Sequence, residues 1–514
     1  MSLTKLETQS KLSINPIRNR NKYNIYPLTP TFVKHYLPSL YKNYTQTLQN
    51  FFITDNKTID IRLREYQNKD IQIMLKRKVN GLFYEQRLGK TPTTISTIAH
   101  NPNIKKTLII APKSTHVNWE NEIYVWHNPN VKVARIRGPL SQRKNYYLSA
   151  DFSYYISTYE TAAKDLELFP EFDCIVIDEI HRLRNFKGQR SNKSPTFTKK
   201  ILQLSYKIPY KFALSGTPAS NKSEDIFPIL NFLYPNIFSS YWSFIEFYYV
   251  LSTEYTVTRN GWEPIQVVKD LKPDGKIYLQ EFLDLTCIQR KRKDHMKWIP
   301  KVDKQLIKLE MTPKQKKYYN QLNTTWECEE LGYDCPNILS LTTRLRQITN
   351  LEDGCKEEFV LSYIEDYPNE KIIISSFFSS CLEHLRLRIT QKGIKTFIIT
   401  GTTTAKDRQR IVDEFNNTNE PIILLGNVSV IKEGLKLEQA HTFIELDPSL
   451  TQADNQQVYD RFIPTTEEVA IKKEKQQIIK LIAKDTIDEY IFSCLKLKKT
   501  SAEIINNYKS NKVV

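Results

Sequence analysis

The run GLFYEQRLGKT occupies residues 81–91, and the run CIVIDEIH occupies residues 174–181. Each run begins with mostly apolar residues that are typical of a buried strand and then turns polar. In a parallel sheet, polar residues that follow a strand gather at the carboxyl edge, where ligands bind. The two runs together therefore predict an α/β fold with a phosphate-binding loop and a carboxylate pair at one edge of a sheet.

The first run carries the side chains that a bound nucleoside triphosphate requires. A lysine reaches the β and γ phosphates, a hydroxyl binds Mg²⁺, and a glycine lets the backbone approach the phosphates closely. Lys90, Thr91 and Gly89 occupy these three positions. A string this short also occurs at the start of ordinary surface helices, so it needs support from elsewhere in the chain.

Asp178 and Glu179 give that support because they follow an apolar strand directly. Asp178 is expected to hold Mg²⁺, often through water, and Glu179 to orient and deprotonate the water that attacks the γ-phosphate. An acidic cap of the following helix explains either residue alone but explains the joint pattern poorly. The expected ligands are therefore a nucleoside triphosphate and Mg²⁺, and the family resemblance described below implies that the nucleotide is ATP.

Composition indicates which kind of molecule the protein binds and in which cellular compartment it is found. The net charge of +17 favours a polyanionic partner such as nucleic acid, although a lysine-rich surface that serves solubility explains the excess equally well. The 7 cysteines form no CxxC pair, which indicates reduced thiols. Neither a secretion signal nor an apolar stretch of membrane-spanning length is present, so we expect a soluble, cytoplasmic protein, in the host cytoplasm if a phage encodes it.

Apolar, β-branched runs recur along the chain and set its expected organisation. They lie at residues 107–111, 154–157, 174–177, 212–214, 372–375, 396–399, 422–425 and 443–446. Helix-like segments separate them, which indicates two parallel sheets that are each covered on both faces. We therefore expect two α/β lobes with a cleft between them, at residues 61–233 and 301–485.

The segments outside the two lobes have their own expected structures. Residues 234–300 are aromatic-rich and lack the regularly spaced apolar runs of the two lobes, which suggests a helical insertion packed on the first lobe. Residues 1–60 are expected to form a small accessory domain whose aromatic residues either build a core or stack on nucleic acid. Residues 472–480 are expected to be a charged, exposed stretch, and residues 486–514 to hold a C-terminal bracing helix.

Further strings resemble, in order, the motifs of superfamily 2 helicases, and among them those of the Swi/Snf-type double-stranded DNA translocases. The strings are LREYQ at 63–67, LIIAPKS at 108–114, NWE at 118–120, STYE at 157–160, DEIHRLRN at 178–185, LSGTP at 214–218, RKR at 290–292, TRLRQ at 343–347, GTTT at 401–404, KEGLKL at 432–437, QVYDR at 457–461 and TIDE at 486–489. The resemblance implies that both lobes are RecA-like.

The resemblance also implies roles in the nucleotide site. Gln67 would read the adenine edge, and Gly434 would help to bind the nucleotide. Gln457 and Arg461 would reach the γ-phosphate from the second lobe, where an arginine contributes roughly a thousandfold or more in related systems. An ion pair between Arg461 and Asp460 or Glu489 is the ordinary alternative.

The family counterparts of five further residues grip the sugar-phosphate backbone of DNA. These residues are Lys113, Ser114, Thr158, Thr403 and Asn427. Such contacts carry no sequence information, so recognition of DNA shape or branching is expected. His181, Ser215 and Thr217 would relay the nucleotide state to this grip, and a structural hydrogen bond is the alternative for each.

Two positions depart from the family pattern. Arg87 stands where such phosphate loops often have glycine, and Pro464 stands where the family usually has a second arginine. Arg461 is the last arginine of the chain. Either one arginine suffices, or Arg408 or Arg410 contributes.

The resemblance therefore implies an ATP-dependent DNA helicase or translocase acting on branched or forked DNA, similar to phage branch-migration helicases. Two other functions stay open from the sequence. One is a duplex-DNA pump subunit of a restriction or packaging system, and the other is a non-hydrolysing DNA-binding scaffold.

Overall fold

The computed structural model describes residue 34 and residues 58–149, 151–184, 197–216, 223–258, 261–299, 301–418, 420–432, 435–464, 467–471, 476–497, 499 and 501–508. The chain divides into two compact units, Met1–Lys291 and Arg292–Val514, and each is considered by itself. The predicted accessory domain at residues 1–60 lies outside the described residues, apart from positions 34 and 58–60.

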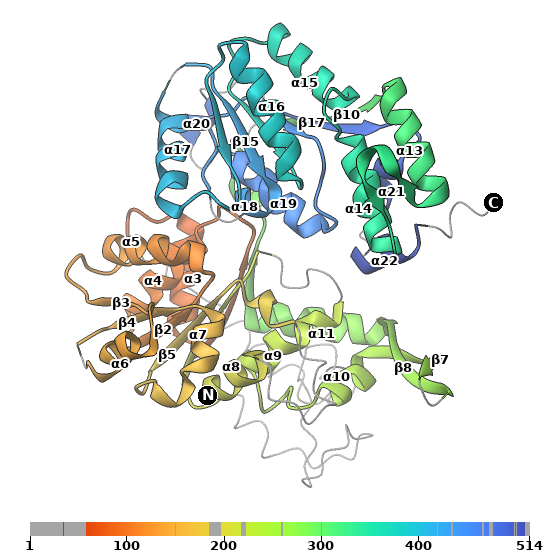
Figure 1. The fold of residues 1–514 in the computed structure, drawn as a ribbon. Coiled ribbons are helices and arrows are strands. Elements are labelled where there is room, and N and C mark those ends of the chain that lie inside the picture. The colour runs from red at the N-terminus through yellow and green to blue at the C-terminus, as the bar shows by residue number, and fades with distance from the viewer. Residues whose placement is uncertain are drawn as a thin grey trace. The chain divides into compact units, whose positions relative to one another are not determined.

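The first unit is built on a seven-stranded sheet in the order β3-β4-β2-β5-β6-β1-β9 (Figure 1). Its strands are β1 (Val79–Tyr84), β2 (Thr107–Ile110), β3 (Val133–Arg135), β4 (Tyr154–Ser157), β5 (Cys174–Asp178), β6 (Tyr210–Leu214) and β9 (Cys287–Arg290). All neighbouring strands run parallel. β2, β4 and β5 are buried along their whole length, as apolar strands of a sheet covered on both faces should be.

Helices cover both faces of this sheet, as right-handed crossover connections require (Figure 1). One layer contains α3 (Glu65–Leu75), α4 (Lys90–Ala99) and α5 (His116–Trp126). The other contains α6 (Leu140–Leu148), α7 (Tyr159–Lys164), α8 (Phe197–Ser205) and α9 (Phe227–Leu233). The predicted α/β architecture of the first lobe is confirmed.

The segment at residues 234–300 differs from the helical insertion that we expected. It contains α10 (Tyr241–Tyr248), the antiparallel hairpin of β7 (Tyr249–Thr258) and β8 (Gly261–Leu271), α11 (Pro273–Thr286), β9 and α12 (Arg292–His295). The two strands contain many β-branched and aromatic residues, which favour extended backbone, so an aromatic-rich composition did not require helices here. The segment also returns to the first sheet, because β9 pairs with β1.

A buried ion pair fixes β9 against α3. Asp70 of α3 is fully buried and accepts hydrogen bonds from the guanidinium of Arg290 and the hydroxyl of Tyr84. The backbone of Glu85 donates to the carbonyl of Arg290 at 3.0 Å. The phosphate loop therefore leaves β1 from a rigid base.

The second unit is built on a six-stranded parallel sheet in the order β10-β17-β16-β13-β15-β14 (Figure 1). Its strands are β10 (Val302–Leu309), β13 (Ile372–Ser376), β14 (Thr396–Ile399), β15 (Ile423–Asn427), β16 (Thr442–Glu445) and β17 (Gln476–Ala483). The flanking helices are α15 (Cys355–Asp366), α16 (Ser379–Gln391), α17 (Ala405–Asn417), α18 (Val428–Ile431), α19 (Gln452–Phe462) and α20 (Glu467–Ile471). The predicted second parallel sheet is confirmed.

A separate apolar cluster completes the second unit. It joins α13 (Pro313–Thr325), α14 (Ile338–Thr349), α21 (Ile487–Lys496) and α22 (Ser501–Asn506), with a small hairpin of β11 (Glu327–Cys328) and β12 (Tyr333–Asp334). The chain beyond residue 486 thus holds two helices among the described residues where one bracing helix was expected. Within the described ranges, no helix has both the length and the apolar character of a membrane span.

The stretch at residues 472–480 was expected to be exposed, and for its described part this is wrong. Gln476 to Lys480 form the first half of β17, which pairs with β10 and β16 and is largely buried. The Nζ of Lys480 lies 3.8 Å from Glu445 Oε1 and 4.6 Å from the centre of the Tyr459 ring. The Lys480 side chain thus lies over the Tyr459 ring, and its ammonium group is paired with Glu445. A lysine can therefore lie in this strand, although the charge-rich sequence around it suggests an exposed segment.

Candidate nucleotide site and its surroundings

The candidate site of the first unit lies at the carboxyl edge of three adjacent strands, β5, β6 and β1. Asp178 ends β5 opposite Leu214 of β6, and Leu214 is also opposite Leu82 of β1. Since the strands are parallel, the residues that follow them emerge together. The fold therefore brings the predicted phosphate loop, the carboxylate pair and Ser215 to one edge.

The phosphate loop runs from Glu85 to Gly89 and leads directly into α4. Arg87 has a φ of 74° and Gly89 a φ of 78°, both in the left-handed region. Arg87 thus adopts the conformation that glycine adopts most readily, which explains why glycine often stands at such a position. At Gly89, a Cβ would lie 2.5 Å from Nε2 of Gln67, so a side chain there would also displace the Gln67 amide.

Lys90 is the first residue of α4, and its Nζ donates to the carbonyl of Tyr84 at 3.0 Å. This contact folds the ammonium group back over the loop, where phosphate oxygens would enter. Thr91 follows in the first turn and is half-buried. Backbone amides at a helix start, an ammonium group and a hydroxyl form a suitable cradle for a phosphate.

Gln67 was predicted to read the adenine edge, and the structure ties its side chain to the phosphate loop. Its Nε2 donates to Gly89 O at 3.2 Å and to Thr93 Oγ1 at 3.0 Å, and its Oε1 accepts from the backbone of Arg64 at 2.9 Å. Contact with adenine stays a prediction. Holding the loop is the role that the structure shows.

Asp178 is buried, with 9% of its surface exposed, and its pKa is raised to about 6. Burial is the largest cause of this rise and the negative charge of Glu179 adds to it, while a hydrogen bond from Trp119 and the charge of Lys90 oppose it. Trp119 Nε1 donates to Asp178 Oδ2 at 3.0 Å and sets the orientation of the carboxylate. A divalent cation would remove the cost of this buried negative charge, and the oxygen donors of Asp178 and Thr91 suit Mg²⁺.

Glu179 has a φ of 53°, which is unusual for a residue with a side chain. Its Oε1 accepts from Gln86 Nε2 of the phosphate loop at 3.3 Å. The Nδ1 of His181 lies 3.3 Å from Glu179 Oε2 and 3.2 Å from Ser215 Oγ. The structure thus brings one predicted coupling residue, His181, into contact with the predicted base, and a second, Ser215, into contact with His181.

Two residues of this site were not predicted. Gln86 reaches Glu179 from the loop, and Trp119 reaches Asp178 from α5. The sequence shows both within its motifs, but only the fold reveals which way they point. Thr217, the third predicted coupling residue, lies outside the described residues.

Three predicted backbone-gripping residues belong to the first unit, at the same carboxyl edge. Lys113 and Ser114 are exposed in the short 3₁₀ helix η2 (Lys113–Thr115) that follows β2. Thr158 follows β4 and caps α7, since its Oγ1 accepts from the backbone of Thr161 at 3.1 Å. The cap is a structural role, and a contact with DNA stays a prediction for all three.

In the second unit, Arg461 lies near the end of α19 and donates twice to the carbonyl of Lys432, at 3.1 and 2.6 Å. The two acidic residues of the alternative ion pairs have other partners, Asp460 with Arg292 and Glu489 with Lys308. Arg461 is therefore fastened beside the KEGLKL string. Gln457 lies one turn earlier and is half-buried, and Gly434 lies outside the described residues.

Thr403 and Asn427 were predicted to grip DNA from the second unit. Thr403 Oγ1 accepts from the backbone of Thr400 at 3.0 Å, which closes a turn after β14. Asn427 ends β15, and its Nδ2 donates to Phe377 O at 2.8 Å and Ser379 Oγ at 3.1 Å. Its Oδ1 accepts from the backbone of Ser429 at 2.9 Å. Both side chains hold loops at the carboxyl edge of the second sheet, so any grip by these residues acts on already ordered loops.

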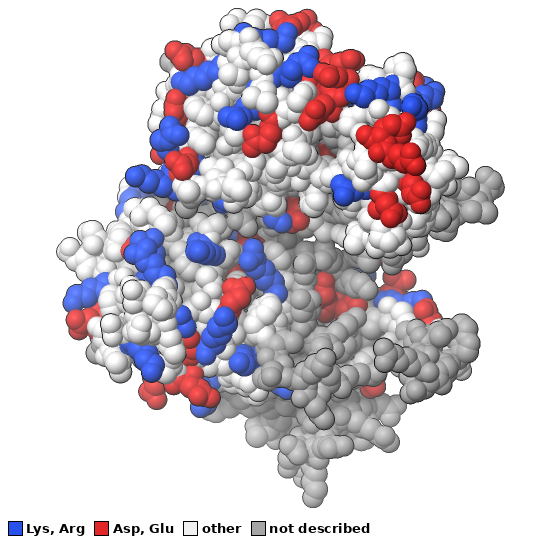
Figure 2. Space-filling view, viewed as in Figure 1, with Lys and Arg blue, Asp and Glu red and all other residues white. Residues whose placement is uncertain are grey.

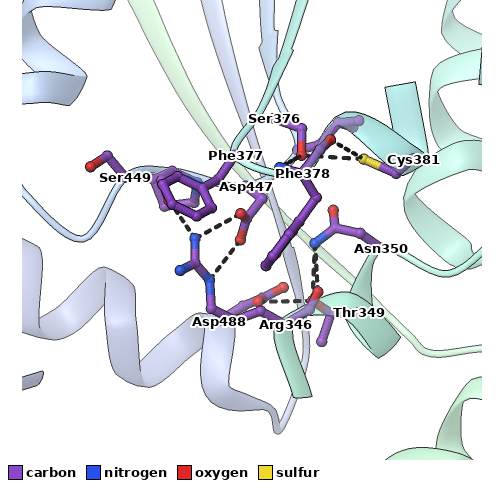
Figure 3. Close-up of polar contacts among 12 residues, drawn as sticks. Arg346, Thr349, Asn350, Ser376, Phe377, Phe378, Cys381, Asp447, Ser449 and Asp488 are labelled. Carbon is purple, nitrogen blue, oxygen red and sulfur yellow. Dashed lines mark hydrogen bonds and ion pairs between the residues drawn. The ribbon is translucent and has the colours of Figure 1, made fainter. Parts of the chain in front are cut away.

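A buried ion-pair cluster joins α14 to the chain that follows β16 (Figure 3). Arg346 of α14 donates to both carboxylate oxygens of Asp447, at 3.0 and 2.7 Å, and its guanidinium lies against the rings of Phe377 and Phe378. Burial raises the pKa of Asp447, although the charge of Arg346 opposes the shift. The TRLRQ string therefore carries a structural arginine.

Two known protein families match most of this chain. The SNF2-related domain matches residues 66–354, and the helicase conserved C-terminal domain matches residues 355–463. A probable ATP-dependent DNA helicase of Arabidopsis thaliana is 24% identical over 482 residues, which cover 85% of this chain and 42% of that protein. An uncharacterized ATP-dependent helicase of Mycoplasma genitalium is 25% identical over 485 residues, which cover 89% and 44%.

Among solved structures, the SWI2/SNF2 ATPase core of Sulfolobus solfataricus in complex with dsDNA is similar to this chain. The sequence identity is 21% and the TM-score is 0.41, over 89% of this chain and 95% of that one. Against the two curated relatives, the chain spans about two fifths of their length.

Proposed function

The chain belongs to the SNF2-related family of ATP-dependent helicases, and from this membership we propose that it hydrolyses ATP to move along DNA. One observation carries the proposal: Lys90, Asp178 and Glu179 converge at the carboxyl edge of a single sheet, each tied to the phosphate loop or to its neighbours. A non-hydrolysing scaffold has no need to keep this complete set.

The residues divide the chemistry between them. Lys90 and the amides that begin α4 bind and orient the phosphates, and Asp178 and Thr91 would hold Mg²⁺. When bound, the cation neutralises charge on the β and γ phosphates. Glu179 accepts the proton of the attacking water, and Gln86 and His181 hold its carboxylate in place. Arg461 would add positive charge at the γ-phosphate.

We further propose DNA as the polymer on which the protein acts. The Arabidopsis relative is named as a DNA helicase, and the net charge of +17 suits a polyanion. Figure 2 shows Lys and Arg interspersed with Asp and Glu over the visible face of both units. We therefore assign the contact with DNA to particular residues at the carboxyl edge of the first sheet, such as Lys113, Ser114 and Thr158, and not to a broad basic patch.

Branched or forked DNA is the substrate class that we propose within this function. Support comes from the motifs, which resemble those of phage branch-migration helicases, and from edge contacts suited to the sugar-phosphate backbone. A duplex pump of a restriction or packaging system uses the same contacts. It differs in that it moves duplex without separating the strands.

The test measures ATP hydrolysis with single-stranded, duplex, forked and four-way DNA, together with strand displacement and triplex displacement. We expect the highest rate and clear strand displacement with forked or four-way DNA. Triplex displacement without strand displacement would instead identify a duplex pump. No hydrolysis on any DNA would exclude both motors.

Lys113→Ala is expected to weaken DNA binding equally for all sequences, because the lysine would neutralise one phosphate. The slope of log K against log salt should fall by about 0.9. Fluorescence anisotropy across a salt series measures this slope. Lys105→Ala is the matched control, since Lys105 is exposed just before the amino end of β2, while Lys113 follows the carboxyl end. Equal slopes for the two variants would refute the assignment of Lys113.

A further inference from the structure

Two buried aromatic residues connect the predicted DNA-gripping segments of the first unit to its carboxylate pair. One is Trp119, which lies one turn after η2, the segment of Lys113 and Ser114. The other is Tyr159, which follows Thr158 directly and begins α7. Each aromatic residue therefore belongs to a helix that directly follows predicted DNA-gripping residues, α5 after η2 and α7 after Thr158.

Trp119 makes its connection through the indole nitrogen. The side chain has no exposed surface, and Nε1 donates to Asp178 Oδ2 at 3.0 Å. Because α5 continues from η2 without a break, a movement of Lys113 and Ser114 displaces the indole as well. Such a movement is expected to change the orientation of the Asp178 carboxylate.

Tyr159 makes its connection through the hydroxyl group. Only 2% of the side chain is exposed, and its hydroxyl donates to the carbonyls of Asp178 and, at 3.1 Å, Glu179. Burial raises the pKa of Tyr159 well above its usual value, so the hydroxyl stays a donor. The same two carbonyls border the left-handed backbone of Glu179, which persists only where its surroundings fix it.

We infer that Trp119 and Tyr159 are positioning residues through which DNA contact at η2 and α7 adjusts Asp178 and Glu179 and so stimulates ATP hydrolysis. The inference rests on the proposed function. It adds a route from DNA to the carboxylates that is separate from the contacts of Ser215 with His181 and of His181 with Glu179. The two connections reach the carboxylate pair at different atoms, so each can be removed on its own.

The test compares Trp119→Phe and Tyr159→Phe with the wild-type chain, using ATP hydrolysis at saturating DNA and without DNA. Each variant should lower the ratio of stimulated to DNA-free rate by about tenfold, the size expected for one hydrogen bond near a charge. DNA affinity, measured by anisotropy, should stay within about twofold of wild type, because no predicted DNA contact is removed.

Two matched controls remove similar hydrogen bonds elsewhere in the same unit. Trp126→Phe deletes an indole bond to Glu122 within α5, and Tyr155→Phe deletes a hydroxyl bond to the carbonyl of Ser149. Both should keep the wild-type ratio. Thermal unfolding of every variant establishes that it is folded, and Tyr159→Phe removes only one oxygen atom.

The outcomes separate this inference from the proposed function. If the ratio stays at the wild-type value in both variants, or if stimulated and DNA-free rates fall by the same factor, the two residues are merely structural and the inference is wrong. If Lys90→Ala hydrolyses ATP as well as wild type in both conditions, the proposed function itself is wrong.

Discussion

Glu179→Gln is expected to lower DNA-stimulated ATP hydrolysis by about a thousandfold, because the amide cannot accept the proton of the attacking water. The amide has nearly the shape of the carboxylate and can still contact Gln86 and His181. Nucleotide binding should therefore persist. A phosphate-release assay gives the rate, and a fluorescent ATP analogue gives the affinity.

Lys90→Ala is the companion variant and should lose both binding and hydrolysis, since the ammonium group binds the phosphates in the ground state and also stabilises the charge that develops in the transition state. Glu167→Gln is the matched control for charge, because Glu167 is exposed in the same unit, in η3 (Leu166–Leu168). It should keep the wild-type rate. Hydrolysis at the wild-type rate by Glu179→Gln would show that another group is the base.

The second large effect concerns stability. Arg346→Met should destabilise the second unit by about 3–5 kcal/mol, since it leaves the carboxylate of Asp447 buried without its ion-pair partner. Arg346 and Asp447 expose only 5% and 1% of their side chains. Hydrogen–deuterium exchange should show lost protection in α14 and around β16.

Arg386→Met makes the same substitution in α16 and serves as the control. Arg386 pairs with Glu383 at 3.5 Å, and the two side chains are 42% and 50% exposed. A pair this exposed contributes about 0–1 kcal/mol. If the two variants unfold alike, the buried cluster contributes no more than a surface pair.

The sequence predicted best the strands that are buried on both faces. β2, β4, β5 and β13 appear as short apolar runs, and their observed bounds differ from the predicted ones by one residue at most. Such runs have few alternatives, because a parallel sheet covered by helices leaves no polar face.

Strands with polar residues escaped prediction. β10 is exposed at most positions, and β17 begins with glutamines and contains Lys480. These strands are defined by their pairing with each other and with β16, which is a long-range property. Local composition cannot reveal such pairing.

The chemistry of the site was readable because charged residues follow strands that the sequence also reveals. The support of the site was not readable. Trp119 and Gln86 stand within recognised strings, yet only the packing of α5 and the path of the loop decide which carboxylate each contacts. Arg87 shows the same limit, since its departure from glycine was visible while its left-handed backbone was not.

The left-handed backbone at Glu179 has an evolutionary consequence. Glycine adopts this conformation freely, whereas a residue with a Cβ loses about 1 kcal/mol there. Screens that select only for thermostability will therefore favour glycine at position 179 and collect inactive sequences. Lineages released from selection for turnover are expected to drift the same way.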